Sequence, residues 1–383
     1  DVPANRIQYL QITLAEAQPD VFMVCELNNE DASNDILSMM QTINPNYAKA
    51  VFINNTSDDA ISDQNDLQNM LYYDSTKFIL ESQAVVTTLF RDFNHYRLKL
   101  NTIEQNTSPI YIDAIVCHLK ASSGSDNEAI RFQMVNDLET YLETLPSNSK
   151  VILAGDMNLY TSSEDGFVEL MDASNNIVFT DPANRVGSWH SNPNYIDVFT
   201  QSTRTQPGLG GATGGFDDRF DFILTSQNLM NDANLQYVAG SYKVFGNNGD
   251  VTCFNREINS ADCAGPEYSF AIRDALYNFS DHLPVTLLLE TNQSLGTNEF
   301  EVQQPIEFIG SNMVDHTLKL KLNNSLLSNQ TLNVYDSLGK LIKTINTKNS
   351  IYINEDMSMF ANGLYYIVLP QFSTKPLKFV IAH

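Results

Sequence analysis

Residues 150–158 read KVILAGDMN, an apolar run that ends in a Gly-Asp-x-Asn pattern. The run has the length and composition of a buried strand, so Asp156 and Asn158 stand at the strand's end. Such residues either cap a turn after a buried strand or belong to a polar site at a sheet edge. Gly155 and the apolar run before it favour a catalytic interpretation.

Other strand-like segments also carry acids or imidazoles at their ends. Glu26 ends VFMVCE, His118 ends DAIVCH, Asp221 lies in RFDFIL, and Asp281 and His282 precede PVTLLLE. Taken singly, Glu26 is typical of a surface carboxylate and His118 of a core histidine. Asp221, between two phenylalanines, needs a partner if it is buried, and His282 would supply one. If these strands share a sheet edge, the polar side chains converge.

The chain alternates many strands with a few helices, which predicts an α/β sandwich of two sheets flanked by helices. Apolar residues at helical spacing predict helices from residue 6, over 34–43 and over 127–145. The Gly-rich run 203–217 predicts a flexible loop beside a polar site or simply a long connection. Strands are predicted at 21–27, 48–53, 69–74, 84–90, 96–103, 110–119, 150–157, 219–226 and 284–290.

The types of side chain at these strand ends indicate hydrolysis assisted by a metal. Carboxylates, one amide and two imidazoles, with no candidate Ser or Cys nucleophile motif, suit attack by water. Hard oxygen ligands such as Glu26 favour Mg²⁺, Mn²⁺ or Ca²⁺ over zinc. A phosphate ester is the natural substrate, because a divalent cation and His⁺ stabilise the negative charge of its transition state.

Charge is distributed unevenly along the 383 residues. Lys and Arg number 22 against 46 Asp and Glu, for a net charge of −24, whereas residues 301–383 carry 7 basic and 6 acidic groups. This excess argues against electrostatic wrapping of nucleic acid but not against an enzyme that binds cations. No apolar run is long enough to cross a membrane. The start, DVPANRIQYL, lacks signal-peptide features, so we expect any signal peptide to be removed or not included.

The four cysteines fall into two kinds. Cys253 and Cys263 enclose a short polar loop, CFNREINSADC, which predicts a disulfide outside the cytosol. Cys25 and Cys117 lie in apolar strand-like runs, which favours buried, inert thiols.

Six motifs in order, PDVFMVCELNN, LYYDSTKF, VCHLKAS, ILAGDMN, RFDFIL and SDHLPV, resemble the endonuclease/exonuclease/phosphatase superfamily over residues 6–290. The resemblance implies the deoxyribonuclease-I-like fold, a four-layer α/β sandwich. It implies that Glu26 ligates the metal and that Asp281 supports the metal or the leaving-group side.

The same resemblance implies roles around the phosphate. Asp156 would orient or deprotonate the attacking water, and Asn158 would hold water or phosphate. His282 would contact the phosphate as a general acid or base and would be oriented by Asp221, while His118 would hydrogen-bond a phosphate oxygen. These roles agree with the chemistry inferred from the residue types.

Two positions depart from the family pattern. The family begins with a strand that ends in a metal-binding Asn, and this sequence starts at the helix expected after it, so we expect that strand to lie upstream or the site to be incomplete. Asn28 stands where the pancreatic deoxyribonuclease type has a minor-groove Arg, which disfavours duplex DNA. The predicted catalytic domain spans 1–290, followed by a polar linker over 291–305.

Residues 306–383 have a resemblance of their own. LNVYDSLGKLIKTI, ANGLYYIVL and KPLKFVIAH resemble the type A sorting domain of the type IX secretion system of Bacteroidetes. That resemblance implies a small Ig-like β-sandwich, recognised by the outer-membrane secretion machinery and commonly cleaved after export. It implies a secreted or cell-surface protein.

Four further residues are weaker substrate-binding candidates. Asn69 would line the site or hydrogen-bond at a strand edge, and Trp189 would stack on substrate or pack in a turn. Arg97 and Arg219 would reach phosphate or form structural ion pairs.

The substrate stays open at this point. A nuclease or phosphodiesterase is the first interpretation, and a lipid-headgroup or inositol phosphate hydrolase is the alternative on the same fold. A surface binding protein that has lost catalysis is the alternative from another class.

Overall fold

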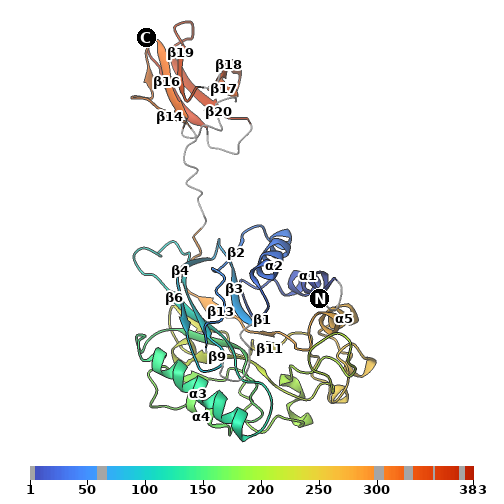
Figure 1. Ribbon diagram of the computed structural model, residues 1–383. Coiled ribbons are helices and arrows are strands. Elements are labelled where there is room, and N and C mark those ends of the chain that lie inside the picture. Colours follow the sequence, from blue (N-terminus) through green and yellow to red (C-terminus); the bar gives the residue numbers. More distant parts are fainter. Residues whose placement is uncertain (1–4, 58–66, 297–305, 323–330, 348–349, 371–375) are drawn as a thin grey trace. The chain divides into compact units, whose positions relative to one another are not determined.

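The structure is a computed structural model that describes residues 5–57, 67–296, 306–322, 331–347, 350–370 and 376–383 (Figure 1). The chain divides into two compact units, Asp1–Thr297 and Asn298–His383, which we call the N-terminal and C-terminal units. None of the helices in the described ranges has the length and apolar character needed to cross a membrane.

A six-stranded sheet with the order β4-β5-β6-β7-β9-β8 forms the centre of the N-terminal unit. β6 and β7 run parallel, and the other neighbours are antiparallel. The strands are β4 (Phe78–Val86), β5 (Phe93–Leu100), β6 (Tyr111–His118), β7 (Val151–Asp156), β8 (Phe179–Thr180) and β9 (Asp221–Ser226).

A second layer of strands packs against this sheet. β3 (Gln68–Asp74) pairs with both β1 (Val21–Leu27) and β2 (Tyr47–Lys49). Two short ladders follow, β10 (Leu235–Tyr237) with β13 (Leu289–Thr291) and β11 (Lys243–Val244) with β12 (Val285–Thr286).

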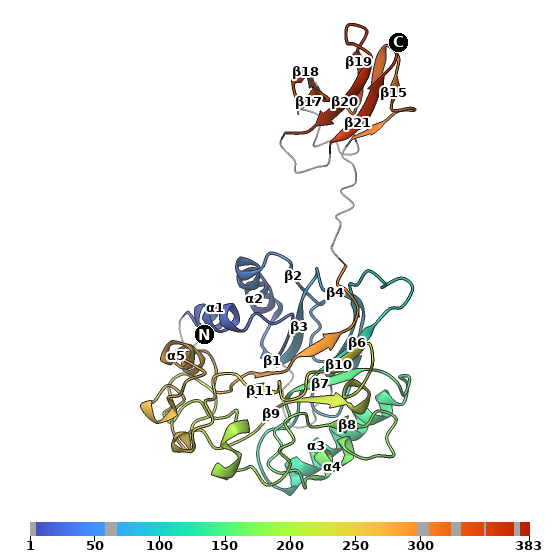
Figure 2. The same ribbon diagram turned by 180° about the vertical axis from the view of Figure 1, so that it is seen from behind.

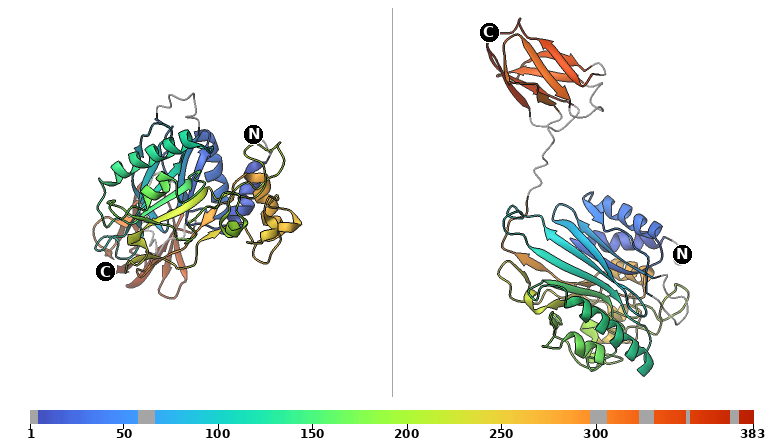
Figure 3. Two further views of the ribbon diagram at one scale, coloured as in Figure 1. Left: turned by 90° about the horizontal axis from the view of Figure 1, so that it is seen from below. Right: turned by 60° about the vertical axis from the view of Figure 1, so that its left-hand side comes forward.

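Helices cover the outer face of each strand layer (Figure 3). α1 (Arg6–Ala17) and α2 (Glu30–Ile43) pack on the β1-β3-β2 sheet, and α3 (Ser125–Leu142) and α4 (Asp165–Leu170) pack on the six-stranded sheet. α5 (Phe270–Phe279) contacts α1. The 3₁₀ helices are η1 (Pro193–Val198), η2 (Gln227–Leu229), η3 (Val251–Cys253) and η4 (Ala261–Cys263). The expected four-layer α/β sandwich is therefore confirmed.

Strand alternation explains these layers. On β6, Ile115 and Cys117 belong to the core under α3 and α4, whereas Ala114 and Val116 belong to the core shared with the β1-β3-β2 sheet. Successive side chains of a strand point to opposite faces, so a strand buried on both faces is apolar almost throughout. This is why 110–119 could be recognised as a central strand.

The bounds of a predicted strand and of the linker need correction. The predicted strand 284–290 is broken into β12 and β13, with Leu288 between them 62% exposed. The predicted linker begins too early, because Ser294 and Gly296 hydrogen-bond to Ile103 and Asn101. Its remainder, 297–305, lies outside the described residues.

The C-terminal unit is a two-sheet β structure with its own apolar core (Figure 2). One sheet has the order β14-β16-β19 and the other β15-β21-β20-β17-β18, with β15 and β21 parallel. The strands are β14 (Ile306–Phe308), β15 (Met313–Val314), β16 (Thr317–Leu322), β17 (Thr331–Asp336), β18 (Leu341–Asn346), β19 (Tyr352–Asp356), β20 (Gly363–Val368) and β21 (Leu377–Ile381).

Candidate active site

Strand register places three of the predicted residues in one row. His118, the last residue of β6, is in register with Asp156, the last of β7. Asp156 is in turn in register with Asp221, the first of β9. Directly paired residues on neighbouring strands lie about 4.5–5.5 Å apart at Cβ, so one edge of the sheet gathers an imidazole and two carboxyls.

Glu26 reaches this row from the opposite sheet. A register shift between Val24 and Leu27 marks a bulge in β1, and Glu26 there has the left-handed φ of 61°. Its Oε1 lies 3.6 Å from His118 Nε2, which is 3.5 Å from Asp156 Oδ2. A bulge re-aims a side chain, and here it turns a carboxylate toward the other layer.

Asp156 and Asn158 form a local clamp after β7. The backbone N–H of Asn158 donates to Asp156 Oδ1 at 3.0 Å, and its Nδ2 donates to Oδ2 at 2.8 Å. Asn158 has φ 50°, a left-handed conformation that Asn adopts more readily than most residues. Both side chains are buried. The Asp-x-Asn spacing thus fixes the carboxyl group at the strand end.

His282 is oriented by Asp221 and also contacts a residue that sequence reasoning missed. His282 Nδ1 lies 2.7 Å from Asp221 Oδ2. The Gln201 side-chain amide contacts His282 Nε2, and residues 201 and 282 form an isolated β-bridge. Gln201 stands in QSTRT, next to the Gly-rich run, and its polar side chain there carried no signal of a site.

Burial and neighbouring charges set the protonation of the row. Burial raises the pKa of Asp156 to about 8, although His282 opposes the shift. Burial, with the positive charges of Arg91 and His282, lowers the pKa of His118 well below its usual value. Burial alone would lower the pKa of His282, but Asp221 and the hydrogen bond to it raise that pKa well above the usual value. The arrangement therefore favours a neutral His118 beside an imidazolium at His282.

Glu26, His118 and Asp156 could hold a metal ion. Their ligand atoms all lie within 4.8 Å of one another. His118 Nδ1 is buried without a hydrogen-bond partner among the described residues, so no second group fixes that nitrogen. Two carboxylates and one neutral imidazole suit a divalent cation, so the donor set fits the expected metal.

Asp281 lies near His282 and accepts a hydrogen bond from the Gly-rich run 203–217. Its Oδ2 accepts a 2.6 Å hydrogen bond from the Ala212 N–H and lies 3.8 Å from His282 Nε2. Gly211 has φ 73°, and a Cβ atom added there would overlap the Asp281 carboxylate. Within the described ranges, Asp281 is not among the three residues close enough to share one ion.

A cavity of about 870 Å³ adjoins the site between the two layers of strands. Glu26, Asp156, Asp221 and His282 line one part of it. Apolar side chains of both layers, such as Met23 on β1 and Ile152 on β7, line the rest. Three carboxyls and one imidazole therefore face the same cavity.

The weaker candidates have structural partners. Arg97 binds Asp113 through two hydrogen bonds of 2.9 and 3.0 Å, and Asp113 precedes His118 by five residues, about 16 Å of strand. Buried Arg219 binds Asp181 through two hydrogen bonds of 2.8 Å. These pairings favour the structural interpretation of both arginines.

Trp189 and Asn69 are also held by the protein. Trp189 is fully buried, and its Nε1 donates to the Leu159 carbonyl at 2.7 Å, which favours the packed-turn interpretation. Asn69 Nδ2 donates to Asp92 O at 3.0 Å and to Asn94 Oδ1 at 2.9 Å. These bonds favour the strand-edge interpretation of Asn69.

Three of the four cysteines follow the sequence expectation, whereas Cys25 is half-buried rather than buried. Cys253 and Cys263 form a disulfide, and Cys25 and Cys117 are free. Cys117 is buried, and burial raises the pKa of both free thiols well above the usual value. Neither thiol is therefore an activated nucleophile.

Comparison with known families decides the identity of the C-terminal unit. Residues 312–382 match the family described as Secretion system C-terminal sorting domain. The C-terminal unit is a sorting domain. It directs the chain to export through the type IX secretion system, to the cell surface or the exterior, and implies the machinery of that system as a partner. Both sequence expectations, the sorting domain and the export, are confirmed.

Outside the sorting domain, the comparisons concern solved structures. The catalytic domain of human Nocturnin aligns over 76% of this chain and 88% of its own, with 14% identity and a TM-score of 0.45. An endonuclease/exonuclease/phosphatase from Bacteroides vulgatus aligns over 75% and 90%, with 12% identity and a TM-score of 0.46. D. rerio TDP2, complexed with a single-strand DNA product, aligns over 75% and 92%, with 16% identity and a TM-score of 0.44. No curated protein matches the sequence.

Proposed function

We propose that the N-terminal unit is a divalent-metal-dependent phosphoesterase that hydrolyses phosphodiester bonds by attack of water. The observation that carries the proposal is the row of His118, Asp156 and Asp221 on one sheet edge, with Glu26 facing it from the other sheet. A row of this kind offers a place for a cation and a place for a phosphate within one site.

The metal would be held by Glu26, with Asp156 and His118 beside it. A divalent cation bound there supplies positive charge that stabilises the carboxylates and the charge that develops on phosphate. Mg²⁺ is the first candidate because of the carboxylates, and Mn²⁺ and Ca²⁺ are alternatives.

Side chains of the protein would then accept and donate the protons. Asp156, held by Asn158, orients the water and accepts its proton. His282, kept positively charged by Asp221, donates a hydrogen bond or a proton to the phosphate side. Neutral His118 donates a hydrogen bond to a phosphate oxygen. Acid and base thus come from two groups, with the pKa of Asp156 raised by burial and the pKa of His282 raised by Asp221.

The test is hydrolysis of a substrate panel with Mg²⁺, Mn²⁺, Ca²⁺ or EDTA. The panel contains bis-p-nitrophenyl phosphate, single- and double-stranded DNA, RNA, and sphingomyelin to represent the lipid alternative. We expect turnover of phosphodiesters that stops in EDTA and falls about 10²- to 10⁴-fold in Asp156→Ala and His282→Ala.

Two control variants distinguish a loss of catalysis from a general loss of folding. Asp232→Asn removes an acid paired with Lys150 at 3.1 Å, and His316→Ala removes an imidazole of the C-terminal unit. Both should retain full turnover. Activity that persists in EDTA, or that is equal in the site variants and the controls, contradicts the proposal.

A further inference from the structure

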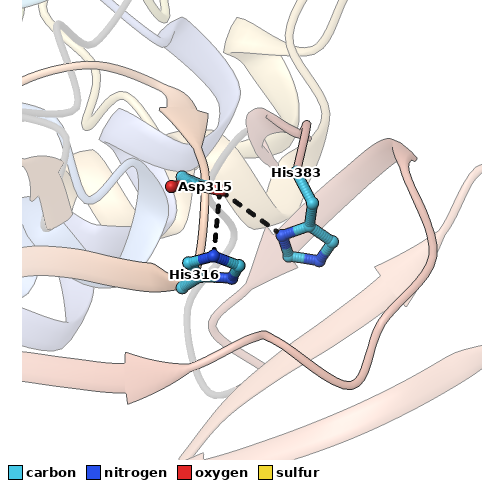
Figure 4. A group of neighbouring side chains, drawn as sticks. All are labelled: Asp315, His316 and His383. Carbon is cyan, nitrogen blue, oxygen red and sulfur yellow. Dashed lines mark ion pairs between the residues drawn. The ribbon is translucent and has the colours of Figure 1, made fainter.

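Three polar side chains of the C-terminal unit meet at one point, although they come from distant parts of the sequence. Asp315 and His316 form the bend between β15 and β16, and His383 follows β21 (Figure 4). Parallel pairing of β15 with β21 sets Val314 beside Ile381, which brings the bend next to residue 383. The cluster thus joins the two sheets, since β15 and β16 belong to different ones.

The distances from the carboxylate to the two imidazoles are those of ligands around an ion. His316 Nε2 lies 3.4 Å and His383 Nδ1 lies 3.6 Å from the same oxygen, Asp315 Oδ1. Both distances exceed a charge-assisted hydrogen bond, which measures about 2.7–2.9 Å. Two ligands each about 2.0–2.1 Å from a tetrahedral zinc ion are about 3.4 Å apart. The gap therefore fits a shared cation better than a direct hydrogen bond.

The orientation of His383 supports the same interpretation. Its Nε2 donates to the Phe360 carbonyl at 3.1 Å, and its backbone N–H donates to Asn362 Oδ1 at 2.9 Å. In the neutral imidazole, a proton on Nε2 leaves the lone pair on Nδ1, the atom that faces Asp315. A metal-binding histidine is commonly fixed in this way, with its other nitrogen bound to a carbonyl.

The imidazole rings of the two histidines lie nearly parallel to each other. The His316 and His383 rings are stacked, with centroids 4.8 Å apart and planes inclined by 16°. Figure 4 shows both rings turned toward the Asp315 carboxylate. The His316 carbonyl accepts from the Met357 N–H at 2.8 Å, which anchors the bend.

We propose that Asp315, His316 and His383 form a binding site for a divalent transition-metal ion, with Zn²⁺ as the natural occupant. Two imidazoles and one carboxylate match the preferences of Zn²⁺ and disfavour Mg²⁺, which takes oxygen ligands. The side chains of Asp315 and His316 are 70% and 62% exposed, so the ion exchanges with solvent and a fourth position stays open for water.

A metal ion bound at this site would link the end of β21 to the bend between β15 and β16. An ion that binds the folded unit and not the unfolded one stabilises it in proportion to the logarithm of its concentration. The C-terminal unit should therefore unfold at a higher temperature as free Zn²⁺ rises. This site is independent of the proposed phosphoesterase.

The test counts bound Zn²⁺ in the full chain. EDTA-stripped protein is dialysed against buffered Zn²⁺ in excess Mg²⁺, and the bound zinc is measured for wild type and variants. The Glu26 group also has ligands for a metal, so the difference between proteins is the readout. We expect Asp315→Asn, His316→Gln and His383→Gln each to bind one equivalent less than wild type.

Two controls match these changes. Glu307→Gln alters an exposed acid of the same unit that pairs with Lys321, and His190→Gln alters a half-exposed histidine of the other unit. Both should bind as much zinc as wild type. Equal stoichiometry in all six proteins overturns the proposal.

A second measurement does not depend on stoichiometry. Co²⁺ substituted into a tetrahedral site with nitrogen and oxygen ligands gives visible absorption bands that octahedral Co²⁺ shows only weakly. We expect these bands in Asp156→Ala, where the other cluster is disrupted, and not in the double variant Asp156→Ala with His383→Gln. Identical spectra in the two proteins refute the site even if one variant folds poorly.

Discussion

His282 Nδ1 and Asp221 Oδ2 lie 2.7 Å apart and join the segment before β12 to the start of β9. The pair is largely buried, with 16% and 14% of the two side chains exposed. An ion pair in such surroundings keeps the imidazole protonated, and so the pKa of His282 is raised well above its usual value despite burial.

Replacing Asp221 by Asn should lower the pKa of His282, because the neutral amide removes the charge that favours the imidazolium. NMR titration of the His282 ring measures this directly. The control is Asp218→Asn, which breaks a similar 2.7 Å contact with His190. It should leave the pKa of His282 nearly unchanged, and an equal fall in both variants would contradict the assignment.

Two neighbouring glycines offer a matched test of the Asp281 carboxylate. Gly210 and Gly211 have φ values of 76° and 73°, but only a Cβ atom at Gly211 would overlap Asp281, whereas the space at Gly210 is open. Alanine at either position costs about 1–2 kcal/mol of backbone strain. Gly211→Ala should in addition displace Asp281 and reduce turnover, while Gly210→Ala should keep it. Thermal unfolding and phosphodiester hydrolysis distinguish the two effects.

Glu139 on α3 should make the protein less stable as the pH rises. Burial, together with the charges of Glu169 and Glu143, raises its pKa to about 8. The folded state thus holds a proton that the unfolded state releases near pH 4.5, so stability falls between these two values and stays low above pH 8.

The variant Glu139→Gln removes this penalty. We expect it to raise the free energy of unfolding by about 1–2 kcal/mol at pH 9 and to have little effect at pH 4. Glu143→Gln, at the residue that follows α3, serves as the control and should gain less. Denaturant unfolding at pH 4 and pH 9 measures the free energy of unfolding of each variant. An increase that is the same at both pH values would rule out titration of Glu139 as the cause.

The Cys253–Cys263 disulfide closes a loop of ten residues in sequence separation. The chain-entropy argument predicts that the double variant Cys253→Ser, Cys263→Ser loses about 3 kcal/mol of stability, or several degrees in Tm. Calorimetry with and without reductant tests this. The wild type should fall to the level of the double variant on reduction, whereas the double variant should not respond.

Much of the site could be predicted from sequence because its residues end or begin strands of one sheet. Three residues of the site stand at the ends of apolar runs that could be recognised in the sequence: His118, Asp156 and Asp221. The register of the strands then sets these residues side by side. The Asp-x-Asn clamp is local as well, since its two hydrogen bonds span two residues. Local pattern was sufficient where the contact itself is local, or where the residues stand at strand ends that meet at one sheet edge.

The remaining features depend on contacts between distant loops. Gln201 meets His282 across 81 residues, and Ala212 binds Asp281 across 69. Arg97 is an exposed-looking cation in the sequence, but its partner Asp113 lies on the adjacent strand. Pairings of this kind follow from the register and the loop path, which no local pattern specifies.

Glu26 bears on how this protein could be engineered. Its backbone occupies a conformation, φ 61°, that costs most residues about 1–2 kcal/mol and costs glycine almost nothing. A library of variants selected only for resistance to heat would therefore accept glycine at position 26, and would discard the carboxylate that faces His118. Selection for thermal tolerance at this position must be paired with a screen for metal binding, since the two properties favour different residues there.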